Sequence, residues 1–452
     1  MAQRRIARTV ARVSDRWHAS VAWLRGFADW NRSYGRASYL RSALWIVPLI
    51  AIALMLAFAP VLRWLDGVVA WRGTALDIDG AQALYQTVIT LTLSFVVFTF
   101  GSLLVAIQVA SGQLTPRIIA TALLRDNVVR YSVGLFVFTL LLTVAALNRL
   151  HAGVYQIVAL VVGLLGIACI TAFLFFIDYA ARLLRPVTIV ARIGEQGLNV
   201  IDAVYPRPLA LAEAAPRSRE DLRPVARVLR HMGRSQIMLA LDLPSLVELA
   251  RAHDGVIELA PQIGDFLAHG EPLFLLHGGA SHIPNRKLLA CVAMGPERTL
   301  EQDPMFAFRI EVDIALKALS PAINDPTTAV LAMDQVHRLL RVVGGRQLRD
   351  DAERDAQGQV RVLLRTPDWE DFVHMACVEI RACGASSIQV ARRMEAMLHD
   401  LIALLPAVRR APLEAQRELM RRAVRAAHPF EEDVQLAAVP DVQGLGGSPL
   451  SA

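Results

Sequence analysis

The sequence predicts an α-helical membrane bundle of four transmembrane helices, followed by a cytoplasmic α+β domain with a small barrel-like β-hairpin region. Four apolar stretches lie between Ser42 and Ala181, and the rest of the 452-residue chain contains no fifth. Hydrophobic residues make up 54% of the chain, which is high for a soluble enzyme, yet the second half is too charged for membrane helices alone. These observations indicate a membrane protein with a large water-soluble part.

Changes in composition divide the chain into successive segments. They are a basic leader rich in Arg and Trp (1–41), a transmembrane domain (42–180), a connector interrupted by prolines (181–235), an α+β domain (236–438) and a disordered tail rich in Gly and Ser (439–452).

The leader carries nine arginines and two aspartates, with Trp17, Trp23 and Trp30 between them. This mixture favours a helix that lies on an anionic inner leaflet, so we expect the lipid bilayer to be a partner. A leader that only sets the membrane topology would explain the same charges equally well.

Each predicted span is long enough to cross the hydrocarbon core, which takes roughly twenty apolar residues. The spans are 43–62, 84–110, 131–147 and 154–177. Arginine is concentrated in the leader, in the 111–130 loop and after the fourth span. By the positive-inside rule, both termini of this multi-pass membrane protein are therefore expected to be cytoplasmic.

The second span is long and weakly polar. Its candidate pore-lining residues follow one helical side: Gln86, Thr90, Ser94, Gly101 and Gln108. Small and hydroxylated residues on one face permit close helix packing, which is one interpretation; a pore or substrate path is the other. No ionisable residue lies in the middle of any span, which disfavours a proton-coupled carrier that uses membrane carboxylates.

The loop after the second span contains Thr115, Pro116 and Arg117. A threonine followed by proline is typical of a helix start, so a short amphipathic helix is expected from Pro116. Arg117 would contact a lipid phosphate or pair with the soluble domain.

In the soluble half, a predicted β-hairpin joins the apolar runs 256–259 and 273–276, with turns at Gly264-Asp265 and at Gly270. Its shape resembles the half-barrel of lipoyl-like domains, but the hairpin contains no lysine, which excludes covalent biotin or lipoate there. A following strand, 288–294, is expected to join the same sheet. Further helices are predicted from Asp368 to Leu405, with a break at Gly384, and from Leu413 to Ala427.

The densest motif is FRIEVDIALKALSPAINDPTTA, in which Arg309, Asp313 and Lys317 lie on one polar helix face. A short turn with Ser320 and Asn324 then leads to a second helix, which Asp325 is expected to cap ahead of Pro326. The backbone amides near Thr327 and Thr328 would offer an anion site. A purely structural helix-turn-helix corner is the alternative, because Asp325 already supplies negative charge.

This motif and the run GSLLVAIQVASGQLTPRII, with the spans and the hairpin in this order, resemble the bacterial membrane-protein family called domain of unknown function 2254. The resemblance covers roughly residues 40 to 430 and implies membership and topology. It supplies no catalytic residues, because no activity is established for the family.

Signatures of enzymes and metal sites are absent from the sequence. His253-Asp254 is an isolated pair, the other histidines lack metal-ligand spacing, and no nucleophile elbow or phosphate loop occurs. We therefore expect no enzymatic activity, no metal, no cofactor and no nucleic-acid partner.

Two functions remain compatible with the sequence. One is a homo-oligomeric channel or transport protein, with the second span along the path and the cytoplasmic domain as vestibule or gate. Its polar face at Arg309, Asp313 and Lys317 would then lie at a subunit contact or opening. The other is a membrane-anchored sensor or scaffold whose cytoplasmic domain binds a ligand or partner protein.

Overall fold

The computed structural model describes residues 46–69, 76–113, 127–150, 154–183, 185–209, 224–349 and 351–446. Contacts divide the chain into two compact units, a membrane unit that ends at Arg192 and a second unit that begins at Ile193. The predicted leader and the motif Thr115, Pro116 and Arg117 lie outside the described residues.

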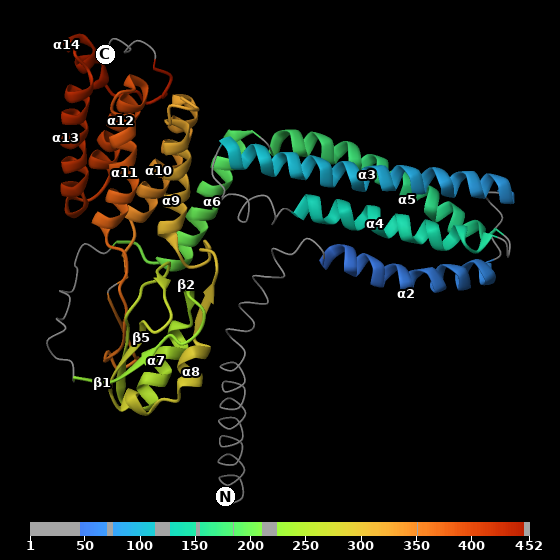
Figure 1. The fold of residues 1–452 in the computed structure, drawn as a ribbon, viewed down its shortest axis with the longest axis horizontal. Helices are drawn as coiled ribbons and strands as arrows, with labels where there is room; N and C mark the ends of the chain where they lie inside the picture. The colour runs from blue at the N-terminus through green and yellow to red at the C-terminus, as the bar shows by residue number, and fades with distance from the viewer. Residues whose placement is uncertain are drawn as a thin grey trace, which may run out of the picture. The chain divides into compact units, whose positions relative to one another are not determined.

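Four long apolar helices lie in the described part of the membrane unit, and each qualifies as a candidate membrane span by length and composition. They are α2 (Ile46–Val69), α3 (Ile78–Gln113), α4 (Asn127–Leu147) and α5 (Gln156–Leu183). They run side by side, and α4 packs against the other three (Figure 1). The prediction of four long apolar helices that are candidate membrane spans is thereby confirmed, and the helix bounds differ by several residues from the predicted ranges.

Aromatic and hydroxyl side chains fill the interior of this unit. The Phe95 ring of α3 stacks on Phe173 of α5, with ring centroids 4.1 Å apart, and tilts against Phe136 of α4 at 5.6 Å. The buried Thr139 hydroxyl accepts a hydrogen bond from Cys169 Sγ, with the two atoms 3.3 Å apart. These two buried polar groups thus find partners inside the unit, as a bilayer requires.

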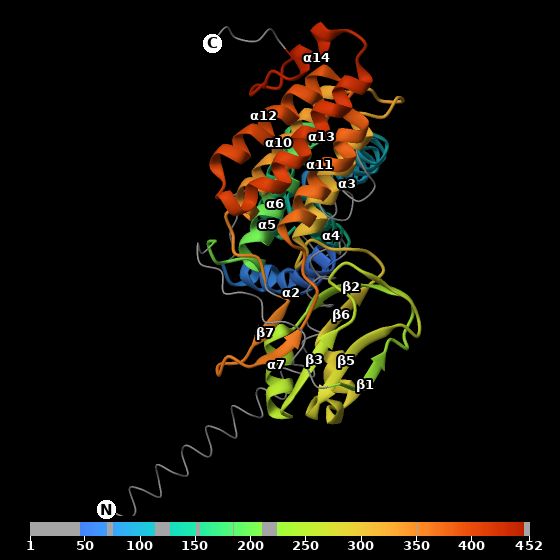
Figure 2. The ribbon, with the colours of Figure 1, turned by 90° about the vertical axis from the view of Figure 1, so that its left-hand side faces the viewer.

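The second unit has a helical layer at one end and a β layer at the other (Figure 2). The helical layer contains the part of α6 (Pro186–Val204) that follows Arg192, together with α9 (Pro304–Ala318), α10 (Pro326–Gly344), α11 (Trp369–Gly384), α12 (Ile388–Leu404), α13 (Arg410–Ala427) and α14 (Glu431–Ala437). Phe372 of α11 packs against both Phe308 of α9 and Tyr205, which follows α6.

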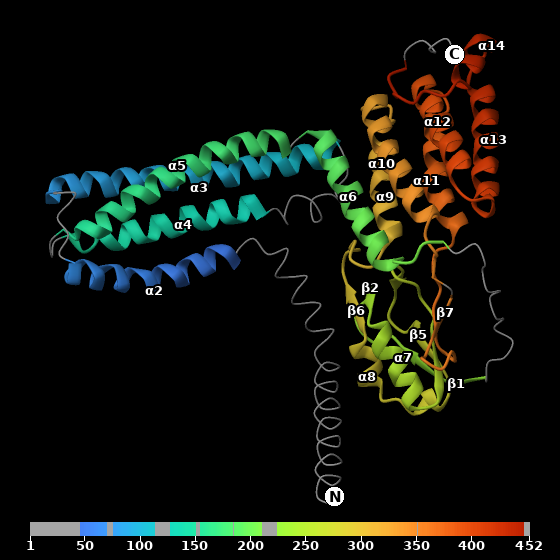
Figure 3. The ribbon, with the colours of Figure 1, turned by 180° about the vertical axis from the view of Figure 1, so that it is seen from behind.

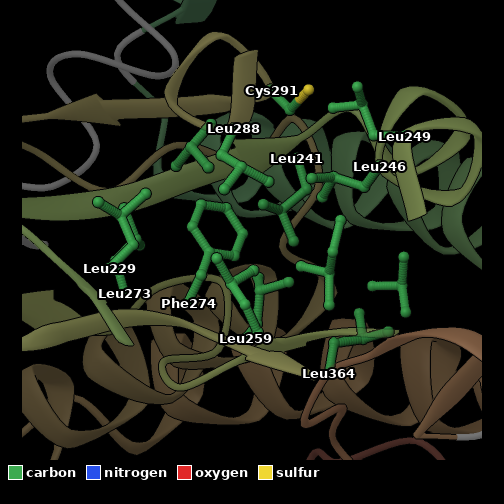
Figure 4. Packing of buried hydrophobic residues seen from close by; sticks show 14 of the residues in the cluster. Leu229, Leu241, Leu246, Leu249, Leu259, Leu273, Phe274, Leu288, Cys291 and Leu364 are labelled. Carbon is green, nitrogen blue, oxygen red and sulfur yellow. The ribbon is translucent and has the colours of Figure 1, made fainter. Parts of the chain in front are cut away.

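The β layer contains two sheets and two short helices (Figure 3). The five-stranded sheet has the order β1 (Val225–Arg230), β5 (Pro272–Gly278), β3 (Gly255–Leu259), β8 (Val360–Leu363), β7 (Ala352–Arg354). The three-stranded sheet has the order β4 (Phe266–Leu267), β2 (Gln236–Leu241), β6 (Val292–Gly295). Phe274 and leucines from both sheets, α7 (Leu243–Ala252) and α8 (Asn285–Ala290) form its core (Figure 4).

The predicted hairpin is confirmed, because β3 pairs antiparallel with β5. The barrel-like expectation is wrong, since the described strands form two open sheets. The strand expected at 288–294 is also wrong in two respects: its first residues belong to α8, and β6 pairs with β2 in the other sheet. Leu288 reaches the core from a helical turn, and a short apolar run does not distinguish helix from strand.

Two segments that composition assigned to a connector and a tail contain ordered structure. The 181–235 segment holds α6 and the edge strand β1. In the tail, the Asp441 carboxylate accepts hydrogen bonds from the backbone N–H groups of Gln443, Gly444 and Gly446, at 3.1, 3.0 and 2.7 Å. The structure thus gives residues 441–446 a hydrogen-bonded turn, whereas glycine content alone predicts disorder there.

Candidate functional site

The five polar or small residues predicted to share one side of the second span are all exposed on α3. Gln86, Thr90, Ser94, Gly101 and Gln108 face away from the rest of the membrane unit. The buried hydroxyls of this helix belong instead to Thr92 and Thr99, both fully buried. At about 100° per residue, these two lie on the opposite side of the helix from the exposed residues. We call the exposed set the α3 polar stripe.

The α3 polar stripe does not pack against the parts of the chain that the structure describes. A Cβ atom added at Gly101 or at Gly112 would meet no atom within 4 Å. At Gly134 of α4, by contrast, it would lie 2.5 Å from Val47 Cγ1. Small residues on α3 therefore leave open space, whereas the glycine of α4 permits a close helix contact.

Hydrogen bonding on the α3 polar stripe is incomplete. The Thr90 hydroxyl donates to the Gln86 carbonyl oxygen at 2.9 Å, and the Ser94 hydroxyl donates to the Thr90 carbonyl oxygen at 2.8 Å. The side-chain amides of Gln86 and Gln108 have no partner among the described residues. The stripe thus presents two amide groups that a hydrocarbon environment cannot satisfy.

The polar face of α9 forms an ion-pair network. Arg309 Nε lies 2.6 Å from Asp313 Oδ1, and Arg309 Nη1 lies 2.9 Å from Glu379 Oε1 of α11. The hydrogen bond with Glu379 is the main reason that the pKa of Arg309 is raised, and the same bond lowers the pKa of Glu379. Lys317 is exposed farther along the helix. The network joins two helices of one chain, which gives it a structural role.

The corner between α9 and α10 is built as the motif indicates. Asp325 Oδ1 accepts a hydrogen bond from the Thr328 backbone N–H at 3.1 Å, and Pro326 begins α10. Asn324 adopts the left-handed conformation, with φ of +49°, and its N–H donates to the Ser320 carbonyl oxygen at 2.8 Å. The Thr328 hydroxyl also donates to Asp325, while Thr327 is exposed. Because Asp325 already occupies the Thr328 amide and places a negative charge at the helix start, the geometry favours the structural corner over an anion site.

Comparison with known proteins gives the chain a family. The family model described as "Predicted membrane protein (DUF2254)" matches residues 41–400. The chain belongs to this family. Uncharacterized proteins of Mycobacterium bovis and Mycobacterium tuberculosis are 28% identical to it over 433 residues, covering 89% of this chain and 80% of each relative. No solved structure matches. DUF2254 membership confirms the resemblance drawn from the sequence and establishes a membrane protein of unknown function.

Sequence reasoning missed Glu311, a fully buried residue on α9 of this DUF2254 chain. Neither carboxyl oxygen has a hydrogen-bond partner among the described residues. Burial alone raises the pKa of this carboxyl well above its ordinary value, so the group is held protonated. The sequence did offer a signal for this burial, because Glu311 lies on the same helix face as Ala307 and Ala315, one helical turn before and after it.

A second missed cluster joins α10 to α12. His337 Nε2 lies 2.8 Å from Asp400 Oδ2, and Arg393 Nη2 donates to His337 Nδ1 at 3.2 Å. Burial is the main reason that the pKa of His337 is lowered, and the charge of Arg393 adds to this effect. The arrangement holds a neutral imidazole whose Nε2–H donates to Asp400. Among the described residues, no three His, Cys, Asp or Glu side chains gather as metal ligands would.

Proposed function

We propose that this membrane protein is a homo-oligomeric channel or transport protein, in which the α3 polar stripe of each copy faces a shared path. The observation that carries the proposal is the exposure of the stripe on the side of α3 opposite its buried threonines. An amide without a hydrogen bond in an apolar environment costs roughly 2–7 kcal/mol. Water in a path, or another copy of α3, would satisfy Gln86 and Gln108 at lower cost than lipid.

The proposal places the protein in the bacterial inner membrane with both termini in the cytoplasm. Its support is the concentration of arginine in the leader and in the loops expected inside. The second unit then forms a cytoplasmic vestibule or gate. The proposal includes no catalytic step and no cofactor.

Flux through liposomes that contain the full chain tests the path. Ser94→Leu and Thr90→Leu replace stripe hydroxyls with apolar groups and are expected to lower ion or small-solute flux. Thr171→Leu is the matched control, because Thr171 of α5 is also exposed and its hydroxyl also donates to a carbonyl oxygen one turn earlier, that of Ile167. Absence of wild-type flux under varied voltage and osmotic gradients, or equal flux in all variants, would remove the basis of the pore.

Assembly is tested separately by the mass of the complex in mild detergent. Gly101→Leu is expected to leave the chain folded, because open space surrounds this position, and to lower the oligomer mass or the flux. An oligomer with intact flux in Gly101→Leu would place the subunit contact and the path elsewhere.

A membrane-anchored sensor or scaffold, whose soluble part binds a ligand or partner, is the second candidate. Cavities in the second unit favour it. Ligand binding without any flux would support this alternative.

A further inference from the structure

Two adjoining cavities lie in the second unit, where the C-terminal end of α6 meets β7 and two loops. The larger, of about 400 Å³, is lined by residues 203–207, 347–349 and 352–354. The smaller, of about 40 Å³, is lined in part by residues 364–367. Both share Val204, Tyr205 and Arg349. We call the two together the arginine cavity, and the larger is of a size that holds a small ligand.

Positive charge predominates in the arginine cavity. Arg207, Arg349 and Arg354 line the larger part, and Arg365 joins Arg349 in the smaller part. The carboxylates are Glu353 and Asp303. Asp303 is already engaged, because it pairs with Arg298 at 2.5 Å and caps α9 by accepting from the Phe306 N–H at 3.0 Å.

Three of these arginines have open hydrogen-bonding capacity. The guanidinium groups of Arg207, Arg349 and Arg365 make no hydrogen bond or ion pair with any described residue. Elsewhere in the unit, arginines such as Arg309 and Arg393 are paired with carboxylates. Like charges around one cavity repel each other, so an anion between them is favourable.

Tyr205 supplies a neutral donor at the same place. Its side chain is 2% exposed, and its ring packs edge-on against Phe372 with centroids 6.2 Å apart. Its hydroxyl makes no hydrogen bond with a described residue, although the residue lines both parts of the cavity. Burial raises the pKa of Tyr205 to about 12, so the hydroxyl keeps its proton at neutral pH.

Backbone hydrogen bonds fix the walls that carry these groups. The Gln347 N–H donates to the Arg207 carbonyl oxygen, and the Leu209 N–H donates to the Gly345 carbonyl oxygen, both at 2.9 Å. The segment after α6 is thereby tied to the loop after α10. A pre-formed cavity binds without the entropic cost of ordering its walls.

We propose that the arginine cavity binds a small phosphorylated molecule, with Arg207 and Arg349 on its phosphate oxygens and the Tyr205 hydroxyl as an additional donor. Guanidinium groups match phosphate geometry and form strong, charge-assisted hydrogen bonds. This site does not depend on α3 lining a pore.

Binding of pyrophosphate to the full chain in nonionic detergent, measured by calorimetry, tests the proposal. Arg349→Gln and Arg207→Gln are each expected to weaken binding about 10-fold, which corresponds to about 1.4 kcal/mol. Tyr205→Phe is expected to weaken it less. Arg286→Gln is the matched control, because Arg286 is exposed on α8 and lines neither part of the cavity, and it should bind as the wild type does.

Short-chain phosphatidic acid, as a second probe, distinguishes a lipid headgroup from a soluble phosphate compound. Binding of either probe that depends on the arginines supports the site. The probe that binds then shows whether the phosphate belongs to a lipid headgroup or to a soluble compound. No saturable binding of either probe to the wild type would overturn it, as would equal affinities in wild type and arginine variants. Arg207 is exposed, so Arg207→Gln remains informative if Arg349→Gln melts at a lower temperature.

Discussion

Replacing Glu311 by Gln is expected to make the second unit more stable, by an amount that increases with pH. The folded chain holds this carboxyl in its protonated form, because the charged form would be buried without a partner among the described residues. In the unfolded chain the carboxyl titrates near its ordinary value of 4.5. Above that value the wild type must therefore bind a proton in order to fold.

The raised pKa determines how the stability difference between the wild type and Glu311→Gln changes with pH. Below the ordinary pKa both states are protonated, and Glu and Gln differ little, since each buries an unpartnered polar group of similar shape. As the pH rises, the free energy of unfolding of the wild type falls by at most about 1.4 kcal/mol per pH unit. As the pH rises above the ordinary pKa, the advantage of Glu311→Gln should therefore grow. Glu311→Met removes the polar group altogether. Its free energy of unfolding should therefore exceed that of Glu311→Gln by about 1–3 kcal/mol at every pH.

Thiol labelling of Cys377 measures this difference in the full chain. Cys377 is fully buried on α11, which packs against α9, so it reacts only when this layer opens. Labelling is followed by mass spectrometry across a urea gradient at each pH, in nonionic micelles. Wild type and variant carry the same thiol, so its intrinsic reactivity cancels in the comparison. A difference that does not change with pH, or a variant that is less stable at high pH, would refute a buried neutral carboxyl.

Three further substitutions test the second unit. Asp325→Ala should lower its free energy of unfolding by about 1 kcal/mol through loss of the cap to Thr328, and an unchanged urea midpoint would contradict that role. Gly197→Ala should lower the free energy of unfolding by about 1–3 kcal/mol, because the new Cβ would lie 2.8 Å from Leu339 Cδ2. An unchanged free energy of unfolding would mean that α6 shifts freely to make room for the methyl group. Asp441→Ala should speed amide hydrogen exchange in residues 441–446, and protection equal to wild type would show that other contacts hold this turn.

Local chemistry made the membrane spans and the α9–α10 corner predictable. A span is recognised by its length of apolar residues, since the hydrocarbon core of a typical bilayer is about 30 Å thick. The Asp325 cap needs only its own side chain, the following proline and an amide three residues away. Neither feature depends on distant parts of the chain.

The β layer and the arginine cavity were not predictable, because both depend on contacts between distant parts of the chain. β8 is four residues long and pairs in parallel with β3, about a hundred residues earlier in the chain. Arg207, Arg349 and Arg365 carry no signal as isolated arginines, and Tyr205 follows a helix that composition assigned to a connector. Only the fold brings these side chains to one cavity.

The sequence by itself determined that the chain has four candidate membrane spans, that polar and small residues follow one side of α3, and how α9 turns into α10. The tertiary structure decided which side of α3 is used for packing: Thr92 and Thr99 face inward, and the α3 polar stripe faces out. It also decided that Glu311 is buried with no hydrogen-bond partner among the residues that the structure describes. The reason is physical, because the length and caps of a helix depend on its own residues, whereas the burial of each face depends on what the rest of the chain brings against it.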